Sequence, residues 1–100
     1  MKVDAIVIKR GDNVATALRD IEPREMITVK VCEESKKISV QDKIPYGHKF
    51  AFTDIRRGDY ILKYGEVMGR ATSDIALGAY AHVQNIESLR GRGDLDSERK

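Results

Sequence analysis

The sequence predicts a mainly β fold of short strands joined by one-turn elements, with one short helix. Its apolar residues fall in short runs rich in Val, Ile and Tyr, which favour strands. Turn-forming residues, above all Gly and Asp, separate these runs. One pattern of Ala, Asp, Ile, Gly and Tyr also occurs twice, which indicates a fold with internal symmetry.

Length and composition indicate one domain. The chain has 100 residues, of which 41% are hydrophobic and 34% charged. Its positive and negative residues nearly balance, and a net charge of +2 is too small to indicate a nucleic-acid-binding surface. Cys32 has no second cysteine for a disulfide, and no run approaches a membrane span. The charged N-terminus does not resemble a signal peptide, so we expect a cytoplasmic protein that binds neither nucleic acid nor membrane.

The first two elements lie before Pro23. Segment 3–8 is, apart from Asp4, an apolar run rich in β-branched residues, which predicts a buried strand. Asp12 is a good helix N-cap, and apolar residues follow at helical spacing until Pro23. These residues are Val14, Leu18 and Ile21. Segment 12–22 is therefore the predicted helix.

The remaining elements are strands. Segment 26–31 alternates apolar and polar residues, and a polar turn at 33–37 leads to the strand-like segment 38–40, which predicts a hairpin. Further strands are predicted at 48–53, 60–64, 67–71 and 80–86. Residues 1–88 form the predicted domain, and the charged, glycine-containing segment 89–100 forms a flexible tail.

A repeated unit organises the chain. Its two full copies read Ala51-x-x-Asp54-Ile55-x-x-Gly58-x-Tyr60 and Ala71-x-x-Asp74-Ile75-x-x-Gly78-x-Tyr80. A degraded copy begins at Ala17 and has Arg24 in place of the glycine, which predicts a different geometry for that turn. In such a unit Asp caps a turn, Ile enters the core and Gly takes a positive φ.

His48 is the first candidate for chemistry, since no phosphate loop, zinc-type spacing or nucleophile elbow occurs. It follows Pro45 and Gly47 at the start of a predicted strand, and Lys49 comes next. Together they would offer an anionic ligand a proton-transfer group and a cation. Alternatively, His48 only begins an aromatic strand face that continues to Phe50.

His82 and the arginines near the C-terminus are the other candidates. If 80–86 is a strand, His82 and Gln84 share a face that would hold an anion, but they are too few to bind a metal alone. The alternative is an exposed polar face. Arg90 and Arg92 suit a carboxylate, and the alternative there is a solvated tail.

An ordered set of motifs resembles the altronate/galactarate dehydratase family, specifically its N-terminal module. The motifs are Ile44-Pro45-Tyr46-Gly47-His48-Lys49-Phe50-Ala51, Asp54-Ile55-Arg56-Arg57-Gly58, Lys63-Tyr64-Gly65, Gly69-Arg70-Ala71, His82-Val83-Gln84-Asn85 and Arg90-Gly91-Arg92-Gly93-Asp94. The resemblance covers residues 4–95 and implies a SAF-type β-clip fold. In some members the module heads a longer chain, and in others, including sulfolactate sulfo-lyases, it is a separate small subunit.

The resemblance implies a hydro-lyase small subunit that caps an active site in a separate large subunit and is inactive without it. Its substrate would be a sugar acid, and its cofactor a divalent metal, iron or manganese, bound mainly by the large subunit. His48 and His82 would be catalytic. The residues expected to bind substrate are Lys49, Asn85, Arg90 and Arg92.

Two departures from the family pattern are Gln84, where members usually have a second histidine, and Arg24. The alternatives are a (2R)-sulfolactate sulfo-lyase small subunit and a non-catalytic carbohydrate-binding module of the same fold. The resemblance leaves open which sugar acid is the substrate, which of the two metals is used and whether the chain forms a homo-oligomer.

Overall fold

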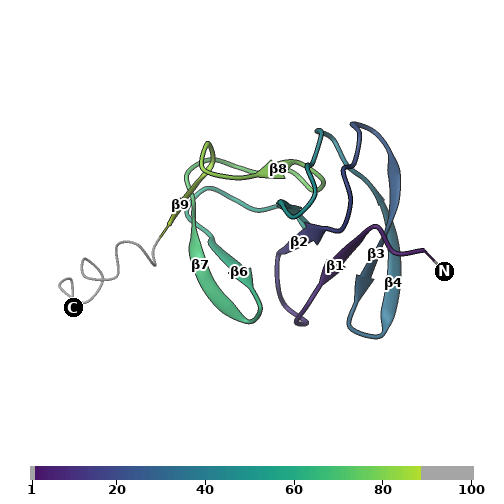
Figure 1. The fold of residues 1–100 in the computed structure, drawn as a ribbon. Helices are drawn as coiled ribbons and strands as arrows, with labels where there is room; N and C mark the ends of the chain where they lie inside the picture. The colour runs from purple at the N-terminus through teal and green to yellow at the C-terminus, as the bar shows by residue number, and fades with distance from the viewer. Residues whose placement is uncertain (1, 89–100) are drawn as a thin grey trace.

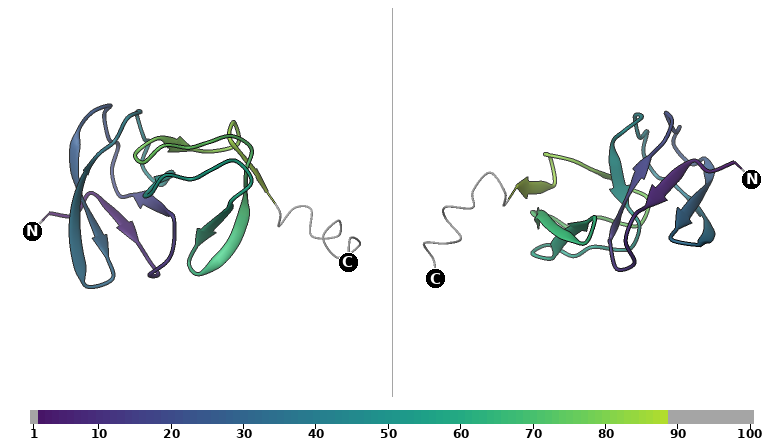
Figure 2. Two further views of the ribbon diagram at one scale, coloured as in Figure 1. Left: turned by 180° about the vertical axis from the view of Figure 1, so that it is seen from behind. Right: turned by 60° about the horizontal axis from the view of Figure 1, so that its bottom comes forward.

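The computed structural model describes residues 2–88, which form nine β-strands and no helix. The strands are β1 (Ala5–Val7), β2 (Val14–Ala17), β3 (Met26–Val31), β4 (Glu34–Ser39), β5 (Lys49–Ala51), β6 (Tyr60–Lys63), β7 (Glu66–Ala71), β8 (Tyr80–Ala81) and β9 (Ile86–Ser88). One sheet has the order β4-β3-β1-β2-β5-β8, and a second has the order β6-β7-β9. The β6–β7 hairpin and the β3–β4 hairpin lie on opposite sides of the molecule (Figures 1 and 2). The predicted mainly β class is confirmed.

The helix predicted over 12–22 is wrong. Residues 14–17 form β2, which pairs antiparallel with both β1 and β5. β2 is buried on both faces at Val14, Ala15 and Ala17, so it is mostly apolar and its residues can imitate part of a helical stripe. Leu18, the middle residue of that stripe, is 44% exposed.

The strand predicted over 80–86 is also wrong, because the chain changes sheets within it. β8 ends at Ala81, a turn occupies 82–85, and β9 begins at Ile86 in the second sheet. The predicted hairpin is confirmed as β3–β4, although β4 already begins at Glu34. The predicted tail, 89–100, lies outside the described residues.

The repeated unit has four copies in the structure. All four have the same succession of bends, bridge and turn, and we call them the turn units. The turn units are 17–26, 40–49, 51–60 and 71–80. Antiparallel bridges between their central isoleucines pair the first with the second and the third with the fourth. These bridges join Ile21 to Ile44 and Ile55 to Ile75.

Hydrogen bonds within a pair of turn units are reciprocal. The Gly58 N–H donates to the Ala71 carbonyl at 2.9 Å, and the Gly78 N–H donates to the Ala51 carbonyl at 2.8 Å. The equivalent donors of the first pair are Gly47 and Arg24, and the acceptors are Ala17 and Val40. The two units of each pair therefore make equivalent contacts, as the predicted internal symmetry requires.

The aspartate of a turn unit caps the turn of its partner unit. An Asp54 carboxylate oxygen accepts a hydrogen bond from the Leu77 N–H, and Asp74 accepts one from the Arg57 N–H, both at 2.8 Å. Side-chain acceptors of this kind satisfy turn amides that lack a backbone partner. The predicted capping role is confirmed, but it acts between units.

The first pair has only one of these caps. Asp20 accepts from the Tyr46 N–H at 2.8 Å. The opposite cap would need an N–H at Pro23, which has none, and Lys43 stands where the second unit would carry its aspartate. The N–H donor and the aspartate acceptor of this cap are therefore both missing. Without the aspartate, the 40–49 copy is not recognisable in the sequence.

Arg24 does not change the turn geometry, contrary to the sequence prediction. Its φ is 68°, close to the 83°, 92° and 87° of Gly47, Gly58 and Gly78. The left-handed conformation costs a non-glycine residue about 1–2 kcal/mol. The hydrogen bonds of the paired units therefore impose this conformation on a residue that does not favour it.

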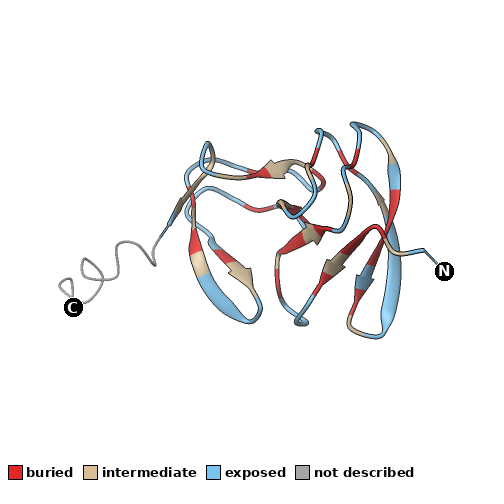
Figure 3. Cartoon of the chain, viewed as in Figure 1, coloured by how far each residue is buried: buried red, intermediate tan, exposed pale blue. Residues whose placement is uncertain are grey.

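The buried residues, most of which lie on strands of the two sheets (Figure 3), form two hydrophobic cores. Neighbouring residues of one strand point into different cores. Ala15 and Phe50 belong to the larger core, whereas Val14 and Ala51 belong to the smaller one. Because β2 and β5 contribute to both, these strands are held from both faces. β2 therefore supports β5, and β5 pairs with β8 to carry the candidate site.

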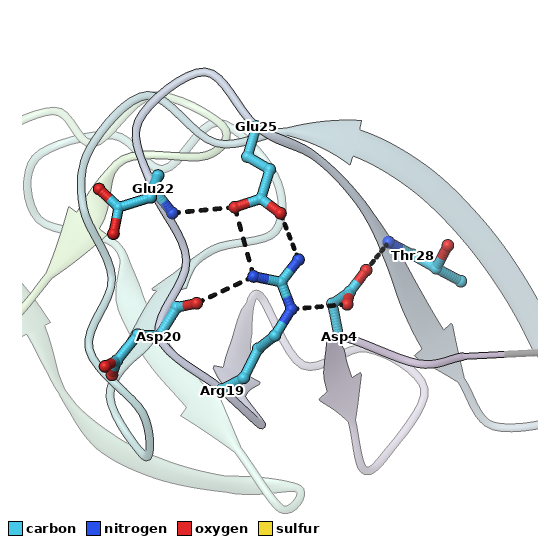
Figure 4. Close-up of polar contacts among 6 residues, drawn as sticks. All are labelled: Asp4, Arg19, Asp20, Glu22, Glu25 and Thr28. Carbon is cyan, nitrogen blue, oxygen red and sulfur yellow. Dashed lines mark hydrogen bonds and ion pairs between the residues drawn. The ribbon is translucent and has the colours of Figure 1, made fainter.

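An ion-pair cluster ties the chain before β1 to the first turn unit (Figure 4). The Arg19 guanidinium donates to Asp4 at 2.9 Å, to the Asp20 carbonyl at 2.9 Å and to both carboxylate oxygens of Glu25. Asp4, which is buried, also accepts from the Thr28 N–H at 2.9 Å. The cluster thus connects β3, the first turn unit and the residues leading into β1.

Candidate functional site

The pairing of β5 with β8 brings the two predicted histidines together. Lys49 and Ala81 are antiparallel partners, so His48, just before β5, lies beside His82, just after β8. Their ring centroids are 5.2 Å apart. Both side chains are partly exposed. Residues that are distant in the sequence thus form one imidazole pair on a rigid strand pair.

Tyr80 joins this pair, and the sequence prediction missed it. Its hydroxyl oxygen lies 2.6 Å from Nδ1 of His48. Its ring stacks on His82 with a centroid distance of 5.4 Å and an interplanar angle of 11°. A signal was present, because Tyr80 closes a repeat unit and stands two residues before His82, the spacing of one strand face.

Asn85 holds the turn that follows β8. Its side-chain oxygen accepts from the His82 N–H at 2.9 Å, and its amide nitrogen donates to the Tyr80 carbonyl at 2.9 Å. Asn85 therefore fixes the backbone that carries His82, while its contact with substrate stays a prediction. Gln84 is exposed in this turn, so it does not share a strand face with His82.

A pocket of about 250 Å³ opens beside His82. Lys49, Lys63 and His82 line it, and the other lining side chains are uncharged. Those side chains are Met68, Val83, Ile86 and Ser88. Burial, and secondarily the charge of Lys63, lowers the pKa of Lys49. Within residues 2–88 neither lysine forms an ion pair, so the described lining offers positive charge that suits an anion.

Lys63 is the second residue that the sequence prediction missed. It ends β6, and the next two residues form the tight turn of the β6–β7 hairpin. The Asp12 carboxylate accepts hydrogen bonds from the N–H groups of Tyr64 and Gly65, each at 2.9 Å. Asp12, the expected helix cap, thus fixes the hairpin that brings Lys63 to the pocket.

The described residues do not form a site for iron or manganese. Within 2–88, no group of three or more His, Cys, Asp or Glu side chains converges. Nδ1 of His48 already contacts Tyr80, and two ammonium groups near His82 oppose a cation. Arg90 and Arg92, predicted to bind substrate, lie outside the described residues.

No helix within residues 2–88 is long and apolar enough to cross a membrane.

Fold and site together define a small all-β domain, built from paired turn units, with a cationic pocket that His82 lines and with His48 next to His82. Residues 3–89 match the altronate/galactarate dehydratase SAF domain. The chain belongs to this family, and its two sheets agree with the SAF β-clip fold that the sequence predicted.

Relatives of two kinds resemble the chain. The altronate dehydratase of Escherichia coli (strain K12) is 36% identical over 94% of this chain, and that of Bacillus subtilis (strain 168) is 40% identical over 83%. The chain spans only 18% and 16% of those two proteins. The (2R)-sulfolactate sulfo-lyase subunit alpha of Chromohalobacter salexigens is 30% identical over 90% of this chain and 99% of its own length.

Proposed function

We propose that this chain is the small subunit of an altronate-type sugar-acid dehydratase and caps an active site held mainly by a separate large subunit. One observation carries the proposal: in a member of this dehydratase family, His82 lines a pocket together with Lys49 and Lys63, and His48 lies against His82. The similarity covers 99% of the sulfo-lyase subunit alpha, which supports a separate small subunit over the N-terminal module of a longer chain.

The chemistry to be explained is the loss of water from a sugar acid. A proton leaves the carbon next to the carboxylate, the hydroxyl of the following carbon departs, and the resulting enol becomes a 2-keto-3-deoxy acid. This reaction needs charge neutralisation at the carboxylate, a base for the carbon proton and an acid for the departing hydroxyl. An anionic enediolate develops during proton abstraction, so positive charge nearby lowers the barrier.

The described residues match the first of these needs and part of the others. In the proposal, Lys49 and Lys63 bind the substrate carboxylate, since their pocket holds two ammonium groups and no carboxylate side chain. His48 and His82 hydrogen-bond substrate hydroxyls or transfer protons. Arg90 and Arg92 would bind the substrate carboxylate or the large subunit.

The large subunit supplies the rest of the site in this proposal. We assign the divalent metal, iron or manganese, to it, because residues 2–88 contain no group of ligands that would hold one. Bound there, the metal would polarise the substrate carboxylate and hydroxyl. Catalysis by this chain alone is therefore not expected.

A sulfo-lyase small subunit is the second candidate. It is favoured by the 99% coverage of the sulfo-lyase subunit alpha, against 18% of the Escherichia coli altronate dehydratase. Proton abstraction next to the carboxylate would be the same, and sulfite would depart in place of hydroxide. A dianionic substrate would also suit two lysines.

Co-expression with a large-subunit gene of the same dehydratase family tests the proposal. We expect a complex that converts altronate or galactarate to a 2-keto-3-deoxy acid, which each subunit alone does not. Sulfite release from sulfolactate would favour the second candidate. If the chain is recovered alone and binds sugar acids unaided, it is a carbohydrate-binding module and the proposal is wrong.

A further inference from the structure

We infer that Tyr80 is a positioning residue that holds neutral His48 in its Nε2–H tautomer, so that His48 offers a hydrogen-bond donor to the substrate. This inference rests on the proposed function for the orientation of His48 toward the shared site. The tautomer itself follows from contacts within this chain.

We assign the direction of the hydrogen bond between the two side chains from Tyr80 to His48. A neutral imidazole has one donor nitrogen and one acceptor nitrogen, and a phenol donates through its only O–H. Among residues 2–88, Nδ1 of His48 is the one acceptor within hydrogen-bond distance of the Tyr80 hydroxyl, at 2.6 Å. Donation from Tyr80 satisfies this partly buried O–H within the chain and requires an unprotonated Nδ1, whereas donation from Nδ1–H would leave the O–H to solvent. The proton of neutral His48 therefore lies on Nε2.

Tyr80 is held rigidly enough to impose this choice. Its backbone pairs with Phe50, and its N–H donates to the Asp42 carboxylate at 2.8 Å. Its ring is stacked on His82. The hydroxyl therefore stays near Nδ1 without help from a ligand, and the tautomer is set before substrate binds.

The tautomer determines what His48 contributes to the reaction. Nε2–H of a neutral imidazole donates to a developing oxyanion or to the departing hydroxyl, but it cannot accept the carbon proton. His48 is then the donor, and the base is His82 or a group of the large subunit. Sequence alone placed both histidines in the same role.

Nitrogen NMR of the full chain with ¹⁵N-labelled histidine tests the inference. At about pH 9, where ordinary imidazoles are neutral, we expect a pyridine-like Nδ1 and a pyrrole-like Nε2 for His48. Tyr80→Phe keeps the ring but removes the hydroxyl, so both signals should move toward values averaged between the tautomers. Tyr60→Phe, at a tyrosine that is 54% exposed, should leave both signals unchanged.

Two results would overturn the inference: a pyrrole-like Nδ1 in the wild-type chain, or an unchanged tautomer in Tyr80→Phe. The wild-type measurement needs no variant, so it decides even if Tyr80→Phe folds poorly. It also needs no partner or substrate, which separates its failure from failure of the proposed function. In the active complex, Tyr80→Phe should lower kcat about tenfold with little change in KM, the scale of one hydrogen bond.

Discussion

Lys49 and Lys63 come from different sheets and line the same pocket. Burial and then the neighbouring Lys63 charge lower the pKa of Lys49, so the arrangement opposes folding of the isolated chain. Charged groups kept in unfavourable positions cluster at functional sites. The pair therefore fits a binding site for an anion that residues 2–88 do not supply.

Removing the Lys63 charge should raise the pKa of Lys49. The rise should be partial, since burial is the larger cause of the lowered pKa and remains in Lys63→Met. NMR titration of ¹³C-methylated lysines in the two proteins measures it. Lys30→Met, at an exposed position in β3, is the control and should not move the Lys49 signal. An unchanged Lys49 titration in Lys63→Met would contradict the shared pocket.

Lys49→Met should stabilise the isolated chain. Because the folded pKa of Lys49 lies below its unfolded value, the unfolded state holds that proton more tightly. The wild type should therefore gain stability as pH rises from the folded pKa to the unfolded one, and the variant should not. Lys49 keeps partial solvent contact, so we expect a Tm increase of about 1–3 °C near pH 7. A lower Tm would show that the ammonium group is needed for folding.

Arg19→Met should reduce the acid sensitivity of the fold. Burial would raise the pKa of Asp4, but hydrogen bonds from Thr28 and Arg19 outweigh it and lower that pKa. The hydrogen bond from Arg19 is also the largest cause of the lowered pKa of Glu25. Both carboxylates therefore stabilise the fold above their unfolded pKa, near pH 4, and this stability is lost as pH falls through the folded values.

Thermal unfolding from about pH 7 to about pH 3 measures this effect, because the range spans both carboxyl titrations. Arg19→Met should lower Tm at the upper end by about 5 °C and flatten the fall of Tm at the lower end. Arg56→Met is the matched control, since Arg56 is exposed and forms no ion pair within residues 2–88. Parallel curves for wild type and Arg19→Met would refute the coupling.

Two glycines at equivalent positions should respond differently to alanine. Gly58 and Gly78 have φ values of 92° and 87°, so either substitution costs about 1 kcal/mol of backbone strain. A Cβ at Gly58 would meet nothing within 4 Å, whereas at Gly78 it would lie 2.6 Å from the Ser39 carbonyl oxygen. Denaturant unfolding should therefore show a larger loss for Gly78→Ala. Equal losses would mean that β4 can move away.

Much of what could be predicted about the fold came from the repeated sequence unit. Asp54 and Asp74 identify two turn units by residue type, and the positions of their glycines follow from turn chemistry. The 40–49 unit was not recognised because it has Lys43 where the other units have aspartate. An aspartate there would have no hydrogen-bond donor, since its partner position is Pro23, which lacks an N–H. Only the pairing of units, a long-range property, shows that the two changes belong together.

The site was predicted in part, for a related reason. His48 and Lys49 stand out in the sequence because Pro45 and Gly47 deliver them to a strand start. Tyr80 and Lys63 have no local signal of comparable strength, since strand pairing and a hairpin held by other residues bring them to the site. The helix prediction failed because a buried central strand can show helical apolar spacing.

The turnover number of the reconstituted complex tests the central claim most directly. His48→Ala and His82→Ala should each lower kcat for sugar-acid dehydration about 100-fold or more, the scale of a lost general acid or base. Lys36→Ala, in β4 at the opposite edge of the first sheet, should leave kcat unchanged. If complexes with both histidine variants assemble and turn over at the wild-type rate, the two histidines are structural and the proposed active site is wrong.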